Sequence, residues 1–390
     1  MRTEGPLHGA SIVCVGFADW QTENWLNQHH LMSRLSRNNT VLFIESLGLR
    51  RPTISTRDLK RIGRRLKRGF RPLRRVDEVN VLSPLIIPYH GNRVIDALNR
   101  ALLRRTARKA TQRLGIERPI LWSYVPQALT LVDALQPSRI VYHCVDDIAA
   151  VSRDAEGTRS AEARMIARAD LVIASSETLA ASLRSRGATV KLMPNVADTT
   201  LFAQALEPGP IDQALASLPR PRIVFVGAVS SVKVDFELII GLARLRPHWS
   251  VVLVGPVGLG DPSTDVSALK TIPNVHLVGH RRHVELPDVL RGADAALIPY
   301  RLNEVTASVF PMKVYEYLAA GLPIVSTPLP SLAGADGVTF AANAPDTASA
   351  IDGLLARANE TARLARSELA RDHSWENRID EIERALSALP

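Results

Sequence analysis

The sequence predicts an α/β protein made of two consecutive domains, each built on a doubly wound parallel sheet. The chain has 390 residues, more than one ordinary domain of about 100 to 200 residues. Short apolar, β-branched runs alternate with stretches of helical spacing, as in βαβ units, and this alternation starts again near residue 222. The composition, 46% hydrophobic and 22% charged, is that of globular proteins and excludes collagen-like, coiled-coil and wholly disordered chains.

The first domain is predicted over residues 1–205. Helical spacing over 24–37 and 159–169 predicts two of the helices that separate its strands. A proline-rich stretch over 206–220 predicts the connection to the next domain. The strands of this domain are predicted at the short apolar runs 11–16, 41–45, 119–124, 139–144, 171–175 and 189–193.

The second domain is predicted over residues 206–370, followed by a last segment over 371–390. An amphipathic helix is predicted over 374–389, where apolar residues from Trp375 to Leu386 recur along one face. Ligands of doubly wound sheets bind outside the carboxyl ends of the strands, so the loops that follow the strands are where we expect chemistry. The strands of this domain are predicted at 222–227, 250–255, 274–278, 293–299 and 323–327.

The cysteines and the apolar runs indicate the cellular compartment. Cys14 and Cys144 lie in apolar runs without a second thiol at ligand spacing, which excludes a disulfide scaffold and a structural zinc site. The first apolar stretch ends at Asp19 and lacks the layout of a signal peptide. No apolar run approaches the roughly 20 residues that span a bilayer. We therefore expect a cytoplasmic chain that contacts membrane only at its surface.

The positive charge is concentrated in one segment. Against a net charge of +9 for the whole chain, residues 50–75 hold twelve Arg or Lys and one Asp. On a helix, apolar residues from Leu59 to Phe70 form a narrow stripe among these cations, which is typical of a helix in an anionic membrane interface. A solvated basic loop is the alternative, and nucleic acid is not expected as a partner because no aromatic residues are interleaved. The predicted membrane contacts are Arg61, Arg64, Arg65, Lys67 and Arg68.

Residues 303–327, NEVTASVFPMKVYEYLAAGLPIVST, carry the most informative pattern. Pro311 suits the first turn of a helix, and a Gly-Leu-Pro sequence ends that helix before a buried strand. A helix start at the carboxyl edge of a sheet favours an anion such as a diphosphate. Glu316 could accept hydrogen bonds from ribose hydroxyls, and Lys313 could add charge near the phosphate or merely pair with Glu316.

Eight positions of this stretch form a longer pattern: Pro311, Lys313, Glu316, Tyr317, Leu318, Ala319, Gly321 and Pro323. The pattern resembles the signature of GT-B glycosyltransferases of the large retaining sugar-nucleotide family, glycosyl transferases group 1, in its bacterial polysaccharide or teichuronic-acid-type branch. Stretches such as VFVGAVSSVKVDFELI, MPNVADTTLF and IVYHCVDDIAAV agree with it, so the resemblance covers nearly the whole chain. It implies two Rossmann-like domains that face a central cleft, with the last helix crossing back to the first domain.

The resemblance also implies roles in binding a donor. Many members have two Glu separated by seven residues; the second matches Glu316, whereas Ser308 occupies the place of the first. Members commonly place Arg after the glycine of the first strand of the second domain and Lys five residues later. Here Gly227 is followed by Ala228, and Lys233 is kept. Lys233 is therefore expected to stabilise the departing nucleoside diphosphate without a metal.

Seven residues make up the predicted donor site. Val278 and Gly279 are expected to frame the base of the nucleotide through their backbone, although an ordinary turn at the end of a strand explains them equally well. The full set of predicted donor contacts is Gly227, Lys233, Val278, Gly279, Ser308, Lys313 and Glu316.

The acceptor side is predicted in the first domain. Asp146 follows a buried strand, where related enzymes often place a His, and could orient or deprotonate the acceptor hydroxyl. Capping of the next helix is the alternative role, which Asp147 could take instead. Asp19 and Trp20 follow the first strand, where such enzymes place a loop over the substrates. We predict Asp146 and Lys233 as catalytic residues, and Asp19, Trp20 and Asp147 as acceptor contacts.

The expected function is transfer of a sugar from a nucleotide diphosphate sugar to a glycan or lipid-linked acceptor, a precursor of a cell-surface polysaccharide. The resemblance implies a retaining reaction. A catalytic metal is not expected, since no His, Cys or Asp cluster has metal-ligand spacing, and no cofactor is expected. The expected location is the inner face of the cell membrane, bound peripherally to its anionic surface. A sugar-nucleotide epimerase of the same fold and a catalytically silent, lipid-binding scaffold remain open, the latter because of Ser308 and Ala228.

Overall fold

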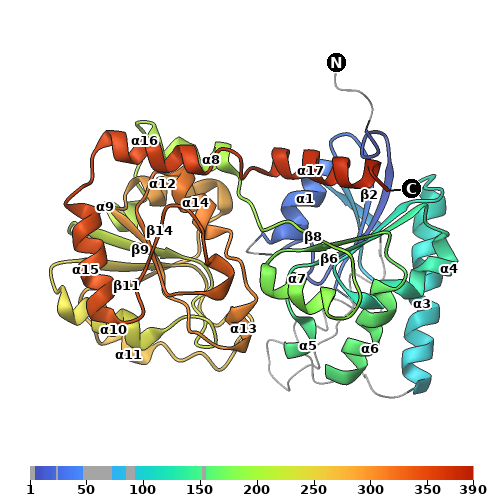
Figure 1. Ribbon diagram of the computed structural model, residues 1–390, viewed down its shortest axis with the longest axis horizontal. Helices are drawn as coiled ribbons and strands as arrows, with labels where there is room; N and C mark the ends of the chain where they lie inside the picture. The colour runs from blue at the N-terminus through green and yellow to red at the C-terminus, as the bar shows by residue number, and fades with distance from the viewer. Residues whose placement is uncertain (1–4, 23–24, 47–72, 85–92, 152–154, 390) are drawn as a thin grey trace. The chain divides into compact units, whose positions relative to one another are not determined.

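The chain divides into two units in the computed structural model (Figure 1). One unit comprises Met1–Met193 and Ile379–Pro390, and the other comprises Pro194–Arg378. The end of the last helix thus belongs to the first unit, and the division falls before the predicted boundary at residue 206. The residues that the structure describes are 5–22, 25–46, 73–84, 93–151 and 155–389.

The proline-rich stretch that was predicted to connect the domains lies within the second unit. The Arg291 guanidinium donates hydrogen bonds to the carbonyls of Gln204 and Glu207, at 2.7 and 2.9 Å. Asp212 pairs with Arg281 at 2.6 Å and also accepts the N–H groups that begin a short helix. These bonds hold the stretch against the rest of the unit, so its prolines shape a packed loop.

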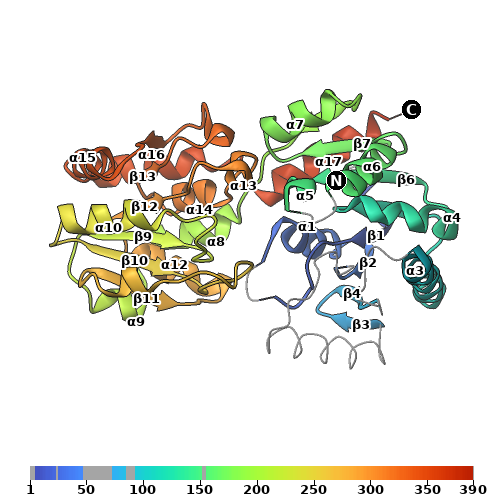
Figure 2. The same ribbon diagram turned by 90° about the horizontal axis from the view of Figure 1, so that it is seen from below.

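The first unit is built on an eight-stranded sheet in the order β3-β4-β2-β1-β5-β6-β7-β8. Every neighbouring pair is parallel except β3 and β4, which form an antiparallel hairpin at one edge (Figure 2). All six predicted strands are present, and the hairpin is an addition that the sequence did not indicate. The strands are β1 (Ser11–Val15), β2 (Thr40–Ile44), β3 (Leu73–Val76), β4 (Val79–Leu82), β5 (Ile120–Ser123), β6 (Arg139–Cys144), β7 (Leu171–Ala174) and β8 (Val190–Leu192).

Helices connect these strands and cover the sheet. Leu103, Met165 and Leu183 come from three different helices and pack into one core with alternate residues of the strands, such as Val13 and Leu42. This alternation follows from the period of two along a β-strand. The helices of this unit are α1 (Asn27–Leu35), α3 (Arg93–Arg113), η1 (Pro126–Leu131), α4 (Val132–Leu135), α5 (Ile148–Val151), α6 (Ala155–Ile166) and α7 (Glu177–Arg184).

The second unit is built on a six-stranded parallel sheet in the order β11-β10-β9-β12-β13-β14. Its inner strands are buried along their whole length and read as continuous apolar runs, as expected for a parallel sheet covered on both faces. All five predicted strands are present, and β14 is an addition. The strands are β9 (Arg222–Val226), β10 (Ser250–Val254), β11 (Val275–Gly279), β12 (Ala295–Ile298), β13 (Ile324–Ser326) and β14 (Val338–Phe340).

Two apolar cores lie within this second unit. Trp249, Leu242 and Ile351 belong to one core, to which α10 and α15 contribute, and Val314 and Leu318 of α14 belong to the other. The predicted α/β class, with two parallel-sheet domains, is confirmed. The helices are α8 (Thr199–Ala203), η2 (Gln204–Leu206), α9 (Gln213–Ala216), α10 (Phe236–Leu245), α11 (Ser267–Lys270), η3 (His283–Glu285), α12 (Leu286–Arg291), α13 (Glu304–Ala307), α14 (Lys313–Ala319), η4 (Pro330–Leu332), α15 (Ala344–Leu355), α16 (Glu360–Leu369) and α17 (Trp375–Ser387).

The basic segment 50–75 is described only at its end. There, Arg74 and Arg75 lie in β3, and Arg74 pairs with the buried carboxylate of Glu45 at 2.8 Å. Within the described part of the chain, no helix has both the length and the apolar character needed to span a bilayer. The predicted membrane contacts lie outside the described residues; they are Arg61, Arg64, Arg65, Lys67 and Arg68.

Candidate functional site

In the sheet of the second unit, the pairing between β9 and β12 ends before the strands do. The chain goes from β9 to β10 on one side and later returns to β12 on the other side of β9, so β9 and β12 form the topological switch point, where such sheets bind ligands. The pairing of β12 with β9 ends at Ala296 and Val224. Beyond Val224 the backbone groups of β9 that faced β12 need other partners.

A tyrosine of α14 supplies one of these partners. The backbone N–H of Val226 donates a hydrogen bond of 2.8 Å to the hydroxyl of Tyr317. Tyr317 is fully buried, and burial raises the pKa of its phenol, so the hydroxyl stays neutral. This bond and the buried Val314 and Leu318 fix α14 against the end of β9. The helix that carries Lys313 and Glu316 is therefore held at the switch point.

Lys313 reaches over the end of β9. A Cβ atom placed on Gly227 would lie 2.6 Å from Cε and 2.9 Å from Nζ of Lys313. The ammonium is 5.8 Å from the centroid of the Phe225 ring. Burial lowers the pKa of Lys313, but the Tyr300 hydroxyl and the Glu316 carboxylate outweigh it, so this pKa is raised and the charge is kept at neutral pH. Lys313 and Glu316, both described, form no ion pair within 4.0 Å, so the simple pairing considered from the sequence is not present.

Glycines end three neighbouring strands at this edge. Gly227, Gly255 and Gly279 follow or end β9, β10 and β11, with φ of 154°, 149° and 78°. A Cβ atom on Gly255 would lie 1.9 Å from the carbonyl oxygen of Gly227, so only glycine lets the two strand ends pack together. Around Gly279, the space that a Cβ atom would occupy has no atom within 4 Å. Gly255 was not singled out from the sequence, because its role depends on strand order.

The loop that carries Lys233 is tied to the loop after β12. The N–H of Arg301 donates to the carbonyl of Lys233 at 2.8 Å, and the side chain of Asn303 donates to the carbonyl of Val232 at 2.9 Å. Within the described residues, no side chain or backbone group hydrogen-bonds or pairs with the Lys233 ammonium. The backbone of this lysine is thus fixed while its charge is left available to a ligand.

Asp261 ties the loop after β10 to the same Lys233 loop. Its carboxylate accepts hydrogen bonds from the hydroxyls of Ser231 and Thr264, at 2.8 and 2.9 Å, and from the N–H of Val232 at 3.2 Å. These donors, above all the hydroxyl of Ser263, hold the pKa of Asp261 far below its usual range, so the carboxylate stays ionised. Sequence reasoning missed this residue because its partners in the loop after β9, Ser231 and Val232, are about thirty positions away.

Glu316 lies one turn after Lys313 and is largely enclosed. Burial raises the pKa of its carboxyl group; Lys313 and His283 lower this pKa, and Asp198 raises it further, with a raised value as the net result. No described residue donates a hydrogen bond to the carboxylate. A half-buried carboxylate without protein donors can accept hydrogen bonds from the hydroxyls of a ligand.

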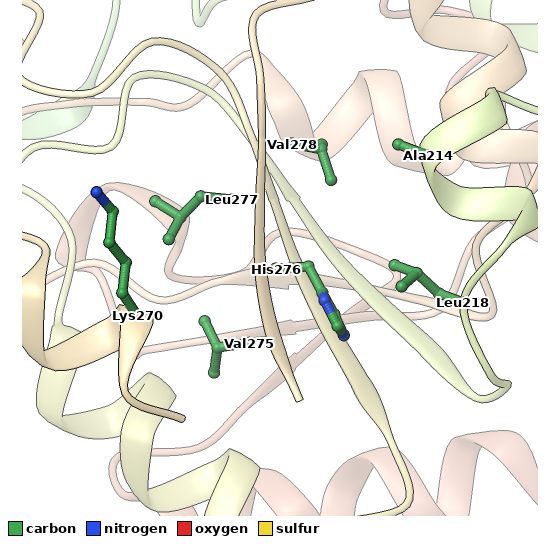
Figure 3. Close-up of a pocket in the computed structure, with 7 residues that line it drawn as sticks. All are labelled: Ala214, Leu218, Lys270, Val275, His276, Leu277 and Val278. Atoms are coloured by element: carbon green, nitrogen blue, oxygen red, sulfur yellow. The ribbon is translucent and has the colours of Figure 1, made fainter. Parts of the chain in front are cut away.

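Ser308 and Val278 are two further predicted donor contacts. Ser308 ends α13 and is only 6% exposed. The side chain of Val278 lines a cavity of about 370 Å³ along the edge strand β11. Figure 3 shows His276 and Val278 on the side of α9, and Val275 and Leu277 on the side of Lys270. Lys233, Lys313 and Glu316 do not line this cavity, so contact of Val278 with a nucleotide base remains a prediction.

In the first unit, the predicted acceptor loop after β1 is held by buried side chains. The N–H of Trp20 donates to Glu45 at 2.8 Å, and the imidazole of His29 bonds the carbonyl of Asp19 at 3.0 Å and the N–H of Leu26 at 3.0 Å. Burial lowers the pKa of His29 to about 4, so the ring is neutral, with Nδ1 accepting and Nε2 donating. The Trp20 ring, 3% exposed, packs in the core, and its contact with an acceptor remains a prediction.

Asp146 and Asp147 follow β6, as the sequence indicated. The Asp147 carboxylate accepts the N–H of Ala149 at 3.0 Å, which caps the first turn of α5. The carbonyl of Asp146 accepts a hydrogen bond from the Cys144 thiol at 3.6 Å. Both aspartates are half-buried, and the roles predicted for them toward an acceptor are untested. Within the described ranges, no group of three His, Cys, Asp or Glu side chains could hold a metal ion.

Comparison with known proteins shows which proteins this chain is similar to. Residues 220–357 match the model of the family described as glycosyl transferases group 1. The chain is 31% identical over 229 residues to TuaH of Bacillus subtilis, named a putative teichuronic acid biosynthesis glycosyltransferase. That match covers 55% of this chain and 57% of TuaH, so the chain matches little more than half the length of this relative.

Solved structures share the whole fold. HepE of Anabaena, in complex with UDP and glucose, is 16% identical with a TM-score of 0.67, over 97% of this chain and 99% of HepE. Sucrose-phosphate synthase of Thermosynechococcus elongatus is 15% identical with a TM-score of 0.67, over 97% and 99% of the two chains. The predicted GT-B fold with two Rossmann-like units is confirmed. Residues 220–357, which contain Gly227, Lys233, Lys313 and Glu316, are similar to the glycosyl transferases group 1.

Proposed function

We propose that the protein is a glycosyltransferase that moves a sugar from a nucleotide diphosphate sugar to an acceptor. One observation carries the proposal: Lys233, Lys313 and Glu316 stand at the switch point of the second unit without ion pairs to described residues. A nucleoside diphosphate complements this set, because its phosphates suit the two ammonium groups and its ribose hydroxyls can donate to the carboxylate. The complex of HepE with UDP and glucose supports the same ligand class.

The reaction breaks the bond between the anomeric carbon and the diphosphate oxygen and forms a bond from that carbon to the acceptor oxygen. Negative charge develops on the departing diphosphate, where Lys233 and Lys313 stabilise it without a metal ion. Asp146 takes the proton of the acceptor hydroxyl. We propose that the configuration of the sugar is retained, with Ser308 in place of a carboxylate beside it. In this scheme the second unit binds the donor and the first unit binds the acceptor.

For the acceptor we propose a lipid-linked or cell-surface polysaccharide precursor. TuaH is named for teichuronic acid biosynthesis, which supports an envelope polymer as product. The basic segment 50–75 would bring the protein to the anionic inner face of the cell membrane. Sedimentation with liposomes of rising anionic-lipid content and rising salt tests this placement. Binding that ignores both variables would argue against an electrostatic anchor.

Titration calorimetry with UDP, GDP and ADP tests the donor site. We expect one of them to bind the wild-type protein, and Glu316→Ala to weaken that binding by about 10-fold to 100-fold, because hydrogen bonds to a charged group are lost. Glu368→Ala, which removes an exposed carboxylate of α16, is the matched control and should bind like the wild type. Equal affinities of Glu316→Ala and wild type would rule out the ribose contact.

Turnover separates an enzyme from a silent scaffold. With membrane extract as acceptor source and the nucleotide sugar whose diphosphate binds best, we expect release of the nucleoside diphosphate and labelling of the extract. Binding without turnover of any nucleotide sugar would favour the lipid-binding scaffold. Interconversion of nucleotide sugars without transfer would favour an epimerase.

A further inference from the structure

We propose that Tyr300 is a positioning residue that holds the Lys313 ammonium over the end of β9, where Lys313 acts beside Lys233 as the second cation for a diphosphate. The identity of the ligand rests on the proposed function; the positioning rests on the geometry of the second unit alone. The residue after Gly227 is Ala228, which brings no charge to this strand end.

Tyr300 is held rigidly just after β12. Its ring is 6% exposed and packs edge-on against Phe225, with centroids 6.1 Å apart and planes at 72°. Its backbone forms a bridge with Val234, and its carbonyl accepts the Thr327 hydroxyl at 2.7 Å. Three separate segments therefore fix Tyr300, whose ring packs against the same Phe225 ring that the Lys313 ammonium approaches.

Lys313 approaches the same end of β9 from α14. Its Cε and Nζ occupy the space above Gly227, and its ammonium lies 5.8 Å from the same Phe225 ring that supports Tyr300. The side chain is thus confined between the end of β9 and the residue that follows β12. Any side chain on Gly227 would displace it, so the glycine and the tyrosine together determine where the charge stands.

The state of this charge indicates a ligand. Lys313 is enclosed, yet no described carboxylate pairs with it within 4.0 Å, and the groups that act on it are the Tyr300 hydroxyl and the more distant Glu316. The ammonium stays charged at neutral pH, and no described carboxylate neutralises it. An anion bound at the switch point would supply the missing partner, and a diphosphate next to Lys233 has the required charge.

Calorimetry on the full-length protein tests the inference with three probes: the nucleoside diphosphate among UDP, GDP and ADP that binds, its free nucleoside, and inorganic pyrophosphate. We expect Lys313→Met to weaken binding of the nucleoside diphosphate by about 10-fold to 100-fold and to leave binding of the free nucleoside unchanged. Tyr300→Phe should cause a smaller loss, and the double variant should bind no more weakly than Lys313→Met alone.

Two matched variants control for loss of a lysine or a hydroxyl elsewhere. Lys270→Met removes an exposed ammonium of α11, and Tyr315→Phe removes a hydroxyl from a ring that stacks on His373 at 3.9 Å. Both should bind the diphosphate like the wild type. Circular dichroism and thermal melting of every variant show whether it folds.

The outcomes distinguish the second-cation role of Lys313, the positioning role of Tyr300 and the proposed function. If wild type and Lys313→Met bind the diphosphate equally, the second-cation role is overturned while the proposed function stands. If the double variant loses as much binding free energy for the diphosphate as Tyr300→Phe and Lys313→Met lose together, the positioning role of Tyr300 is overturned. If pyrophosphate binds but none of the nucleotides does, the proposed function fails. The affinities of the same variants for pyrophosphate then decide whether Tyr300 positions Lys313. If none of these probes binds the wild type, both fail.

Discussion

Carboxylates at the carboxyl edges of the two sheets differ in what surrounds them. In the first unit, Glu45 accepts hydrogen bonds from the N–H of Trp20, from the Arg74 guanidinium and from the Ser83 hydroxyl. In the second unit, Glu316 accepts none from the described residues and stands beside Lys313 without pairing with it. Charges that are satisfied internally hold a loop in place, whereas charges left without partners are available to a ligand.

The two carboxylates differ in their effect on the stability of the folded chain. A buried carboxylate is tolerated when donors replace the water it has lost, and removing it then leaves those donors unpaired. An enclosed carboxylate without donors weakens the unliganded fold, and function is the reason such groups are kept. The comparison therefore predicts opposite effects on stability for substitutions at Glu45 and at Glu316.

The largest expected effect is that of Glu45→Ala. Because it leaves Arg74 and the N–H of Trp20 without their buried acceptor, we expect the free energy of unfolding to fall by about 3 to 5 kcal/mol, with the affinity for a nucleoside diphosphate unchanged. Urea unfolding followed by tryptophan fluorescence measures this. Glu78→Ala, which breaks an exposed pair on the neighbouring hairpin, should cost less than about 1 kcal/mol. Equal losses in the two variants would remove the distinction between buried and exposed partners.

The next effect is the pH dependence that His29 gives the first unit. Its pKa is lowered to about 4 in the folded chain, against about 6.5 when unfolded. Between these values the unfolded chain binds a proton that the folded chain does not, so stability falls as the pH drops from about 6.5 to about 4, by up to about 3 kcal/mol. His29→Gln should flatten this part of the profile measured by urea unfolding. An unchanged slope in that variant would contradict the assignment.

Tyr317→Phe tests the anchor of α14 in the second unit. It leaves the N–H of Val226 buried and unpaired, so we expect a loss of about 1 to 3 kcal/mol in the free energy of unfolding. Nucleoside diphosphate affinity should fall with it, because α14 carries Lys313 and Glu316. Tyr315→Phe, on the same helix, removes a hydroxyl that has no such partner among the described residues, and it serves as the control. If the two variants melt at the same temperature, the hydrogen bond to Val226 does not hold the helix.

The smallest expected effect, that of Glu316→Gln, is a gain in stability. Burial raises the pKa of Glu316, so above its folded pKa the unfolded chain carries the charge more easily, and the ionised carboxylate lowers stability. Glu316→Gln should therefore be slightly more stable than wild type at pH 7, and this gain should vanish below about pH 4, where both states are protonated. Thermal melting at the two pH values checks it. Glu45→Gln should be less stable than wild type at pH 7, and a loss in both variants would break the comparison.

Several local features could be predicted because they depend on neighbours in sequence. The apolar runs of β9 and β10 identify buried strands without reference to their partners, since strands covered on both faces are continuously apolar. The end of α14 at a Gly-Leu-Pro sequence follows from helix chemistry. Lys233, Lys313 and Glu316 could also be predicted as donor contacts, because they match motifs of a known family. The division between the two units falls before residue 206, and proline content does not reveal that Arg291 binds this stretch.

The sequence by itself predicted most of the strands and the presence of two such domains, and its resemblance to a known family supplied the charged residues proposed to bind a donor. Only the tertiary structure decided what those charges touch. Val226 and Tyr317 are 91 positions apart, Glu45 reaches Arg74 across 29 positions, and Tyr300 packs on Phe225 only because β12 lies beside β9. Strand order and the side-chain contacts it creates are properties of the packed chain, and no local pattern encodes them.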